Sequence, residues 1–311
     1  MINKVLFIFV ILIVLFLIFS ILISILLTNK LMYPKVRDEK AVYDREVELK
    51  RFPVEFYKTL DKEEVMIESQ YGYCLSCLVL NNELTKQPQN ANKVAIFCHG
   101  YKCSKTAAVV YAKMLMDLGF TAVLYDHRNH GLSDKKFTSM GFYEKDDLKE
   151  VVEWCLKRYG NKIRIVLHGE SMGATTVLNY LACDDRIAAV IEDCGYSSLP
   201  ELIEHQMKKY FHLSYPLFRP MINAVMKLRA GFTLPEVSAM QGVVKSEIPI
   251  LFIHGDCDDY VPYQMSVKMY EKKKGPKVLY LAKGAIHARS CVVDLQKYSN
   301  VVTQFIQQYY E

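Results

Sequence analysis

Gly169-Glu170-Ser171-Met172-Gly173 is the stretch that decides the fold, because it has the form G-x-S-x-G. The β-branched run 163–167 before it is typical of a buried strand, and the run 174–182 after it is typical of a helix. The pattern predicts a sharp strand-to-helix turn that lifts the Ser171 oxygen clear of a sheet. Side chains at 169 and 173 would collide with neighbouring backbone, and the helix start adds partial positive charge where an oxyanion forms.

Around this turn the chain alternates strand-like and helix-like segments, as a parallel sheet flanked by helices requires. The expected strands cover 65–67, 75–80, 94–98, 121–125, 187–191, 250–253 and 277–281. The expected helices cover 105–118, 143–159 and about 292–310, and glycines end the first two. The fold class is therefore α/β, with a mostly parallel sheet.

One segment, 196–245, interrupts this alternation. It is helix-like, rich in apolar and aromatic residues, and divided by Pro216, Pro220 and Pro235. An insertion of this length between two strands is either a lid or an ordinary pair of packed helices. Its position, after the strand that follows the serine turn, favours a lid.

The first 28 residues are expected to form an uncleaved membrane anchor. The run 5–27 carries no charge, and as a helix it is about 35 Å long, enough to cross a bilayer. A cleaved signal peptide would have a shorter apolar run and a small-residue cleavage site. Lys4 flanks one end and Lys30, Lys35 and Arg37 the other, so the positive-inside rule only weakly favours a cytoplasmic domain and leaves the side of the membrane open.

The 311 residues thus divide into an anchor, 1–28, a polar connector, 29–60, and an α/β domain, 61–311. We expect the connector to contribute little to the core. The net charge of +5 is interspersed along the chain, so no nucleic-acid surface is indicated. Nine cysteines, an odd number, argue against a disulfide framework.

A serine alone is a weak nucleophile and needs a base that a third group holds in place. After such a turn the chain order is Ser, then acid, then His. Three acids, Asp256, Asp258 and Asp259, follow the next-to-last expected strand, and we choose Asp258 with Asp259 as runner-up. His287 follows the last strand and is the only histidine after the acids. Because ligands of open α/β sheets bind at the carboxyl ends of strands, Ser171, Asp258 and His287 are expected to converge as a catalytic triad.

A tetrahedral intermediate also needs two backbone amide donors as an oxyanion hole. Met172, the residue after the serine, supplies one. The strand 94–98 ends in His99-Gly100-Tyr101, where the glycine lets the backbone turn tightly, so the Tyr101 amide is expected to be the second.

Several motifs together resemble the α/β-hydrolase superfamily, and more closely its membrane-anchored bacterial members, grouped with serine aminopeptidases and prolyl-oligopeptidase-like hydrolases. They are His99-Gly100-Tyr101, the run 126–133 (DHRNHGLS), the G-x-S-x-G turn, His254-Gly255 with Asp258 and Val261-Pro262, and His287. The resemblance covers about residue 60 to the end and implies an α/β-hydrolase fold. Its H-G-x-x-D-x-x-V-P pattern places the acid on Asp258. Asn129 replaces a glycine of the usual D-x-R-G-H-G-x-S, in a loop we interpret as structural.

The resemblance and the complete triad make a metal unnecessary, although His99, His127 and His130 offer imidazoles of the kind that metals bind. We therefore expect neither a metal nor a cofactor. Glu170 is expected to be hydrogen-bonded beneath the turn rather than catalytic.

The leading function is a serine hydrolase that cleaves apolar carboxylic esters or thioesters through an acyl-enzyme intermediate, next to a lipid bilayer. A second hypothesis, carried by the resemblance alone, is an aminopeptidase, for which Glu201 and Glu204 are candidates to bind a peptide amino terminus. A third is a non-catalytic, membrane-tethered binding protein on the same fold.

Overall fold

In the computed structural model, which describes residues 2–184 and 186–310, one sheet of eight strands has the order β1-β2-β4-β3-β5-β6-β7-β8. The strands are β1 (Asp61–Glu68), β2 (Cys74–Asn81), β3 (Lys93–Cys98), β4 (Thr121–Tyr125), β5 (Arg164–Glu170), β6 (Ile187–Asp193), β7 (Ile250–Gly255) and β8 (Lys277–Ala282). The β1–β2 and β2–β4 pairs are antiparallel, and every pairing from β4 to β8 is parallel. The predicted mostly parallel sheet is confirmed.

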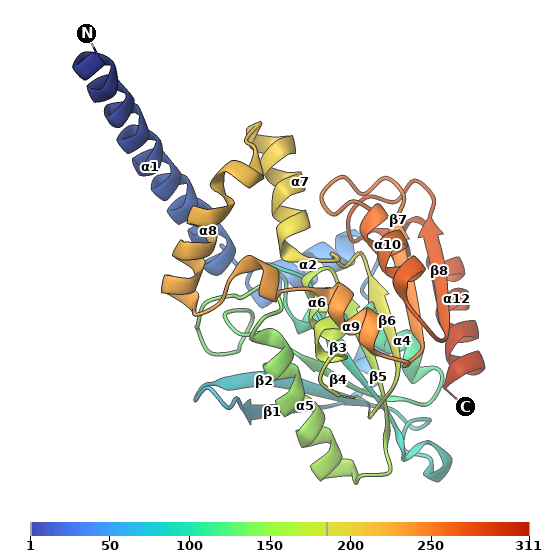
Figure 1. The fold of residues 1–311 in the computed structure, drawn as a ribbon. Coiled ribbons are helices and arrows are strands. Elements are labelled where there is room, and N and C mark those ends of the chain that lie inside the picture. The colour runs from blue at the N-terminus through green and yellow to red at the C-terminus, as the bar shows by residue number, and fades with distance from the viewer. Residues whose placement is uncertain (1, 185, 311) are drawn as a thin grey trace.

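Helices cover both faces of this sheet (Figure 1). They are α4 (Val109–Met116), α5 (Glu144–Tyr159), α6 (Met172–Tyr180), α9 (Ala239–Lys245), α10 (Gln264–Lys272), α11 (Ser290–Val293) and α12 (Leu295–Tyr309). Apolar residues of α5, α6, α9 and α10 pack on one face of the strands, and those of α4 and α12 pack on the other. The central strands β3, β4 and β5 are buried on both sides because their residues are apolar at most positions.

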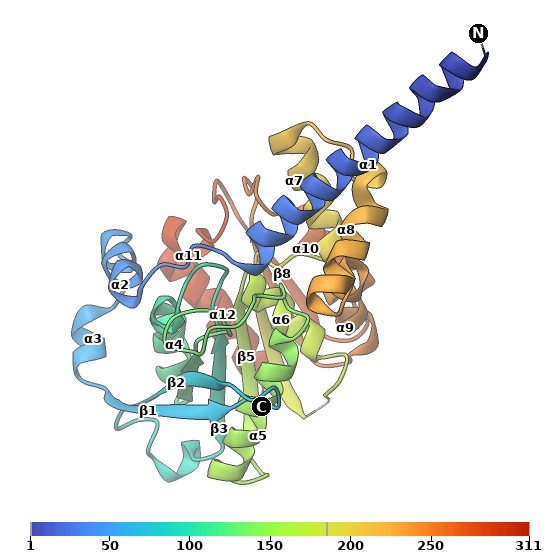
Figure 2. The same cartoon turned by 90° about the vertical axis from the view of Figure 1, so that its left-hand side faces the viewer.

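The N-terminal helix α1 (Ile2–Met32) projects from the domain, as Figure 2 shows. Within Lys4–Met32 an 18-residue window has a mean hydropathy of 3.6, and by length and composition this stretch suffices to cross a membrane. The helix does not stop at residue 28, however. Leu31 and Met32 are buried in the domain, and the Met32 carbonyl accepts a hydrogen bond from the Thr138 amide at 2.8 Å.

The connector packs on the domain, and the expectation that it adds little to the core was wrong. It forms α2 (Glu39–Glu48) and α3 (Val54–Lys58). Phe52 and Leu60 join the apolar cluster on the α4 and α12 face, and the Arg51 side chain is buried. Apolar residues spaced singly in a polar stretch gave no amphipathic period from which this packing could be recognised.

The segment 196–245 divides into two parts. The helices α7 (Leu199–Phe211) and α8 (Tyr215–Ala230) form a hairpin above the carboxyl ends of the strands, beside α1 (Figures 1 and 2). After a short 3₁₀ turn at Leu234–Glu236, α9 packs against α6 so closely that a Cβ on Gly242 would lie 1.8 Å from the Leu178 carbonyl oxygen. Only the hairpin therefore stands where a lid would stand.

Candidate active site

Ser171 occupies the turn between β5 and α6 in a strained conformation, with φ 56° and ψ −113°. Non-glycine residues rarely adopt such angles, and they persist only where the surroundings enforce them. Here the enforcement is steric. A Cβ at Gly169 would lie 2.4 Å from the Gly173 carbonyl carbon, and a Cβ at Gly173 would lie 2.0 Å from the Cys98 oxygen. Both flanking glycines are required by close backbone contacts, as the sequence predicted.

The structure brings Ser171, His287 and Asp258 into one hydrogen-bonded chain. The Ser171 Oγ lies 2.9 Å from Nε2 of His287, and Nδ1 of His287 lies 2.6 Å from Oδ2 of Asp258. The other carboxylate oxygen of Asp258 accepts hydrogen bonds from the amides of Tyr260 and Val261, each at 2.9 Å. This arrangement can hold one imidazole nitrogen protonated and the other free to accept the serine proton.

The other two acids of the Asp258 loop point elsewhere. Asp259 is exposed and pairs with Lys209 of α7 at 2.5 Å, while Asp256 accepts a hydrogen bond from the Gly284 amide at 2.6 Å. Burial alone would raise the pKa of Asp258, but hydrogen bonds with His254 and His287 hold it well below its usual range. The Asp258 carboxyl is thus a charged group beneath the imidazole.

His254 is a partner of Asp258 that the sequence did not reveal. Its Nε2 lies 3.1 Å from Oδ2 of Asp258 and 2.9 Å from the Val261 carbonyl, so this nitrogen carries the hydrogen. The Ser266 hydroxyl lies 2.7 Å from Nδ1 of His254 and 2.7 Å from Oε1 of Glu192. One hydroxyl hydrogen cannot serve both neighbours. The hydroxyl donates to Oε1 of Glu192, and burial raises the pKa of that carboxyl to about 8 despite this bond.

Glu170 is hydrogen-bonded beneath the turn, and its partner comes from the connector. The Arg51 guanidinium lies 2.8 Å from Oε2 of Glu170, and the Tyr111 hydroxyl lies 2.6 Å from the same oxygen. Burial would raise the pKa of Glu170, but Arg51 and the Tyr111 hydroxyl lower it below its usual range. Arg51 also donates to the Ala288 carbonyl at 3.1 Å, next to His287. Arg51 therefore links the serine turn to the loop that carries His287. Because Arg51 is far from both in sequence, no local motif predicts these contacts.

The loop after β3 passes beside the serine. A Cβ at Gly100 would lie 3.6 Å from that of Ser171, and Tyr101 lines the same two cavities as Ser171. Met172 is the first residue of α6, where an amide has no partner within the helix. These are the two amides that the sequence proposed as oxyanion donors.

Two of the three histidines around this loop, His99 and His130, bind backbone through their rings. Nε2 of His130 accepts from the Lys102 amide at 3.1 Å, and Nε2 of His99 accepts from the His127 amide at 3.0 Å. Burial lowers the pKa of His99 and lowers that of His130 to about 3, which keeps both rings neutral and able to accept. These contacts hold the loop that carries Tyr101.

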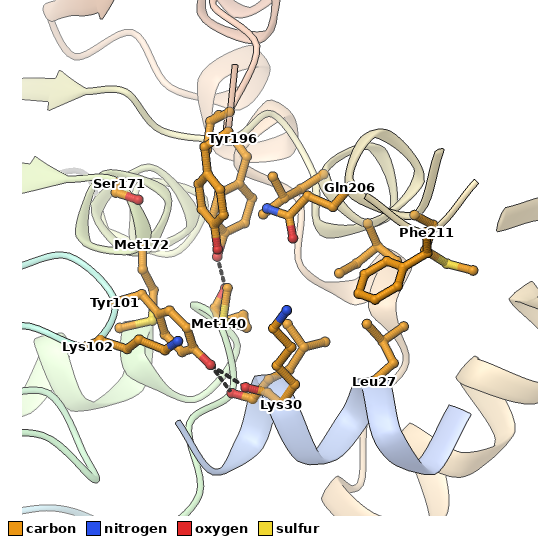
Figure 3. Close-up of a pocket in the computed structure, with 16 residues that line it drawn as sticks. Leu27, Lys30, Tyr101, Lys102, Met140, Ser171, Met172, Tyr196, Gln206 and Phe211 are labelled. Carbon is orange, nitrogen blue, oxygen red and sulfur yellow. Dashed lines mark hydrogen bonds between the residues drawn. The ribbon is translucent and has the colours of Figure 1, made fainter. Parts of the chain in front are cut away.

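Ser171 lines a mostly apolar cavity of about 40 Å³ (Figure 3). Side chains from several distant parts of the chain line it, among them Leu27, Lys30, Leu31, Tyr101, Met140, Tyr196, Leu202, Ile203, Met207, Phe211 and Val261. Neither Glu201 nor Glu204 belongs to this lining among the described residues. The Glu201 carboxylate instead accepts from the Ser197 hydroxyl at 2.5 Å and pairs with Lys268.

A second cavity, of about 290 Å³, also reaches Ser171, and its lining has a larger polar share than that of the first. Arg37, Arg45, Lys102 and Tyr260 contribute to its lining, together with His287. Burial, Lys30 and Arg37 lower the pKa of Lys102. The serine therefore borders both a narrow, mostly apolar space and a wider space with cationic side chains in its wall.

Comparisons with known proteins agree with this geometry. Residues 89–218 match the family described as "Serine aminopeptidase, S33". The uncharacterized protein YqkD of Bacillus subtilis (strain 168) is 34% identical over 287 residues, which cover 91% of this chain and 92% of that protein. Protein ABHD12B of Homo sapiens is 26% identical over 192 residues, 59% of this chain and 50% of its own length.

Solved structures share the fold. The Pyrococcus furiosus esterase Pf2001 superposes with a TM-score of 0.65 at 23% identity, over 86% of this chain and 96% of that one. The esterase EaEST of Exiguobacterium antarcticum has a TM-score of 0.57 at 17% identity, over 79% of this chain and 100% of its own.

Proposed function

The chain belongs to the α/β-hydrolase family, and we propose that it is a serine hydrolase that cleaves carboxylic esters through an acyl-enzyme intermediate. One observation carries the proposal. The chain Ser171–His287–Asp258, with distances of 2.9 Å and 2.6 Å, ends in a hydroxyl at the wall of an apolar cavity. Thioesters fit the same chemistry.

In the proposed reaction Ser171 Oγ attacks the ester carbonyl carbon while Nε2 of His287 accepts the hydroxyl proton. The amides of Tyr101 and Met172 donate hydrogen bonds to the oxyanion, and the charged Asp258 stabilises the imidazolium. The bond from the acyl carbon to the alcohol oxygen then breaks, and His287 gives its proton to the leaving alcohol. Water enters by the same route and releases the acid.

A fluorophosphonate probe tests this proposal directly, because it reacts covalently with an activated serine. The wild type should be labelled and Ser171→Ala should not. Ser238→Ala is a matched control, since Ser238 precedes α9 away from the site and its side chain makes no capping hydrogen bond. Equal labelling of wild type and Ser171→Ala would contradict the serine-hydrolase proposal and would favour a non-catalytic binding protein.

The peptidase alternative has less support. A peptide amino terminus needs an unpaired acid near the serine, and the Glu201 carboxylate is already paired with Lys268. Comparing turnover of aryl esters with that of aminoacyl amides separates the two activities. Faster cleavage of the amides would favour the peptidase.

We also propose that α1 anchors the enzyme in a membrane. Its exposed apolar side chains run without interruption from Val5 to Phe19, a surface that water solvates poorly. Membranes that contain the full chain should retain it after an alkaline carbonate wash. Release into the wash would contradict the anchor.

A further inference from the structure

The end of α1 is fixed against the catalytic domain. The Tyr101 hydroxyl donates to the carbonyls of Lys30 and Leu31. Arg229 of α8 donates to Thr28 Oγ1 at 2.6 Å and to Asn29 Oδ1 at 2.5 Å. The last turns of α1 therefore hold a defined position over the serine, rather than hanging from a flexible tether.

These last turns supply part of the wall around Ser171. Leu27, Lys30 and Leu31 face Met207 and Phe211 of α7 across the cavity, and Figure 3 shows Leu27 opposite Phe211. The cavity's volume of about 40 Å³ is the space of roughly three or four water molecules. A substrate chain of more than a few carbons must continue beyond it.

The continuation is an apolar groove of about 230 Å³ between α1 and the end of α7. It shares four lining residues with the cavity and adds three more: Leu27, Lys30, Met207 and Phe211 are common to both, and Ile23, Leu26 and Leu213 belong to the groove. The two spaces are therefore adjacent, and together they extend from Ser171 along α1 towards its apolar middle.

The hairpin α7–α8 lies beside that apolar middle. The Phe218 ring centroid lies 6.0 Å from that of Phe16 and 5.9 Å from that of Phe19. Phe16 is about 16 Å from Leu27 along the helix. At the turn of the hairpin Tyr210, Phe211 and Leu217 leave large apolar surfaces exposed. If α1 spans a bilayer, this turn lies against the membrane surface, where exposed apolar side chains gain apolar contacts.

Lys30 marks the boundary of this apolar region. Its ammonium lies 5.4 Å from the Phe211 ring centroid, at the junction of cavity and groove. Lysines at helix ends place their charge at the level of lipid head groups while their stems remain in the apolar layer. An ester at Ser171 would sit near that level, with its acyl chain directed into the bilayer and parallel to α1, which is how lipid chains lie.

We propose that the substrate is an ester lipid of the enzyme's own bilayer, whose acyl chain enters sideways through the groove between α1 and α7, and that α1 is a wall of the substrate site. The second cavity at Ser171, which Arg37, Arg45 and Lys102 line, takes the head group. This inference rests on the proposed esterase function and on the anchor, and it names the substrate class and its route.

The test uses the full chain in phosphatidylcholine vesicles with two substrates, p-nitrophenyl palmitate dissolved in the bilayer and p-nitrophenyl acetate in water. Leu26→Trp fills the groove without touching the cavity at Ser171. Leu22→Trp, one turn earlier on α1 and outside both linings, is the matched control. Both leucines are exposed, so both variants are expected to fold.

Leu26→Trp should lower palmitate turnover about tenfold, the loss expected when about two methylene groups of the substrate lose their apolar contacts, and should leave acetate turnover unchanged. Leu22→Trp should change neither. Palmitate supplied in separate vesicles should be cleaved far more slowly than palmitate in the enzyme's own vesicles.

Equal palmitate turnover by Leu26→Trp and Leu22→Trp, or equal cleavage from separate vesicles, would overturn the lateral route. If acetate is still cleaved by a Ser171-dependent reaction in that case, the esterase proposal stands and only this inference fails. If no ester is cleaved at all, both fail.

Discussion

The loops at the strand ends and the assembly of α1, α7 and α8 surround the same serine but are held in different ways. At the strand ends each group is fixed by short directional contacts, such as the 2.6 Å bond between His287 and Asp258. In the assembly the contacts are mostly apolar, such as the ring contacts of Phe218 with Phe16 and Phe19. Directional contacts fail when one atom changes, whereas apolar packing tolerates many substitutions of similar size. Chemistry and substrate choice can therefore be disrupted separately.

The largest effect should come from the serine and histidine. Ser171→Ala and His287→Ala should each lower ester turnover by roughly 10⁴- to 10⁶-fold, because neither group activates the reaction alone. The double variant should be little worse than either single one. Steady-state hydrolysis of p-nitrophenyl butyrate measures all three. Losses that add in the double variant would mean that the two residues act independently and would count against the triad.

Asp258→Asn should cost about 10⁴-fold in turnover, because the amide cannot orient and stabilise the imidazolium as the carboxylate does. Asp259→Asn is its matched control. It removes the neighbouring charge, which lies on the surface and pairs with Lys209. If Asp259→Asn instead causes the large loss, the acid has been assigned one residue too early.

Arg51→Met should destabilise the domain by about 3–5 kcal/mol, because it leaves the buried carboxylate of Glu170 without its cation and Glu46 with only the partly exposed Arg45. Urea unfolding measures this change. Arg45→Met, on α2 and partly exposed, is the control and should cost under about 1 kcal/mol. A small effect of Arg51→Met would mean that the connector does not secure the serine turn.

These two regions also differ in how far the sequence predicts them. The glycines around Ser171, the acids after β7 and His287 after β8 are local signals at strand ends, and strand alternation predicts that they meet. Arg51 meets Glu170 across 119 residues, and Leu27 meets Phe211 across the domain. No periodicity joins such pairs, since an apolar residue in a membrane-spanning run looks the same whether it faces lipid or a cavity.

The neutral Glu192 should give stability a specific pH dependence. Its pKa is raised by burial from 4.5 to about 8, so between these values the folded state holds a proton that the unfolded state has lost. Stability from this group is complete below pH 4.5 and falls as pH rises to about 8. Urea unfolding from pH 5 to 8 should show a smaller decline for Glu192→Gln than for the wild type.

Glu201→Gln is the control for this slope. Burial would raise the pKa of Glu201, but hydrogen bonds from Lys268 and Ser197 lower it below its usual value. The Glu201→Gln variant should therefore show the same decline from pH 5 to 8 as the wild type. Asp193, whose pKa burial raises to about 7, remains in both proteins and cancels in the comparison. Parallel curves for wild type and Glu192→Gln would mean that Glu192 is ionised in the folded state.

The smallest effect concerns the apolar cavity that α1 and α7 line beside Ser171. Each methylene added to the acyl group should raise kcat/KM about fourfold over the first few carbons. Burying one methylene group contributes about 0.8 kcal/mol, which corresponds to this factor. The reason is that the cavity beside Ser171 is narrow and apolar, so short chains fill it step by step. A series of p-nitrophenyl esters from acetate to hexanoate measures the slope.

Phe211→Ser should flatten this slope, because Phe211 lines both the cavity and the groove. Met221→Ser is the matched control, since Met221 lies on α8 and outside both linings. The two variants remove comparable apolar surface from the same hairpin, so a general loosening of the hairpin would affect both. Equal slopes in both variants would mean that α7 and α8 serve only as scaffold. A flatter slope in Phe211→Ser alone would show that this side chain determines acyl-chain preference. Apolar packing would then tolerate substitution as far as stability is concerned but not as far as substrate choice is concerned.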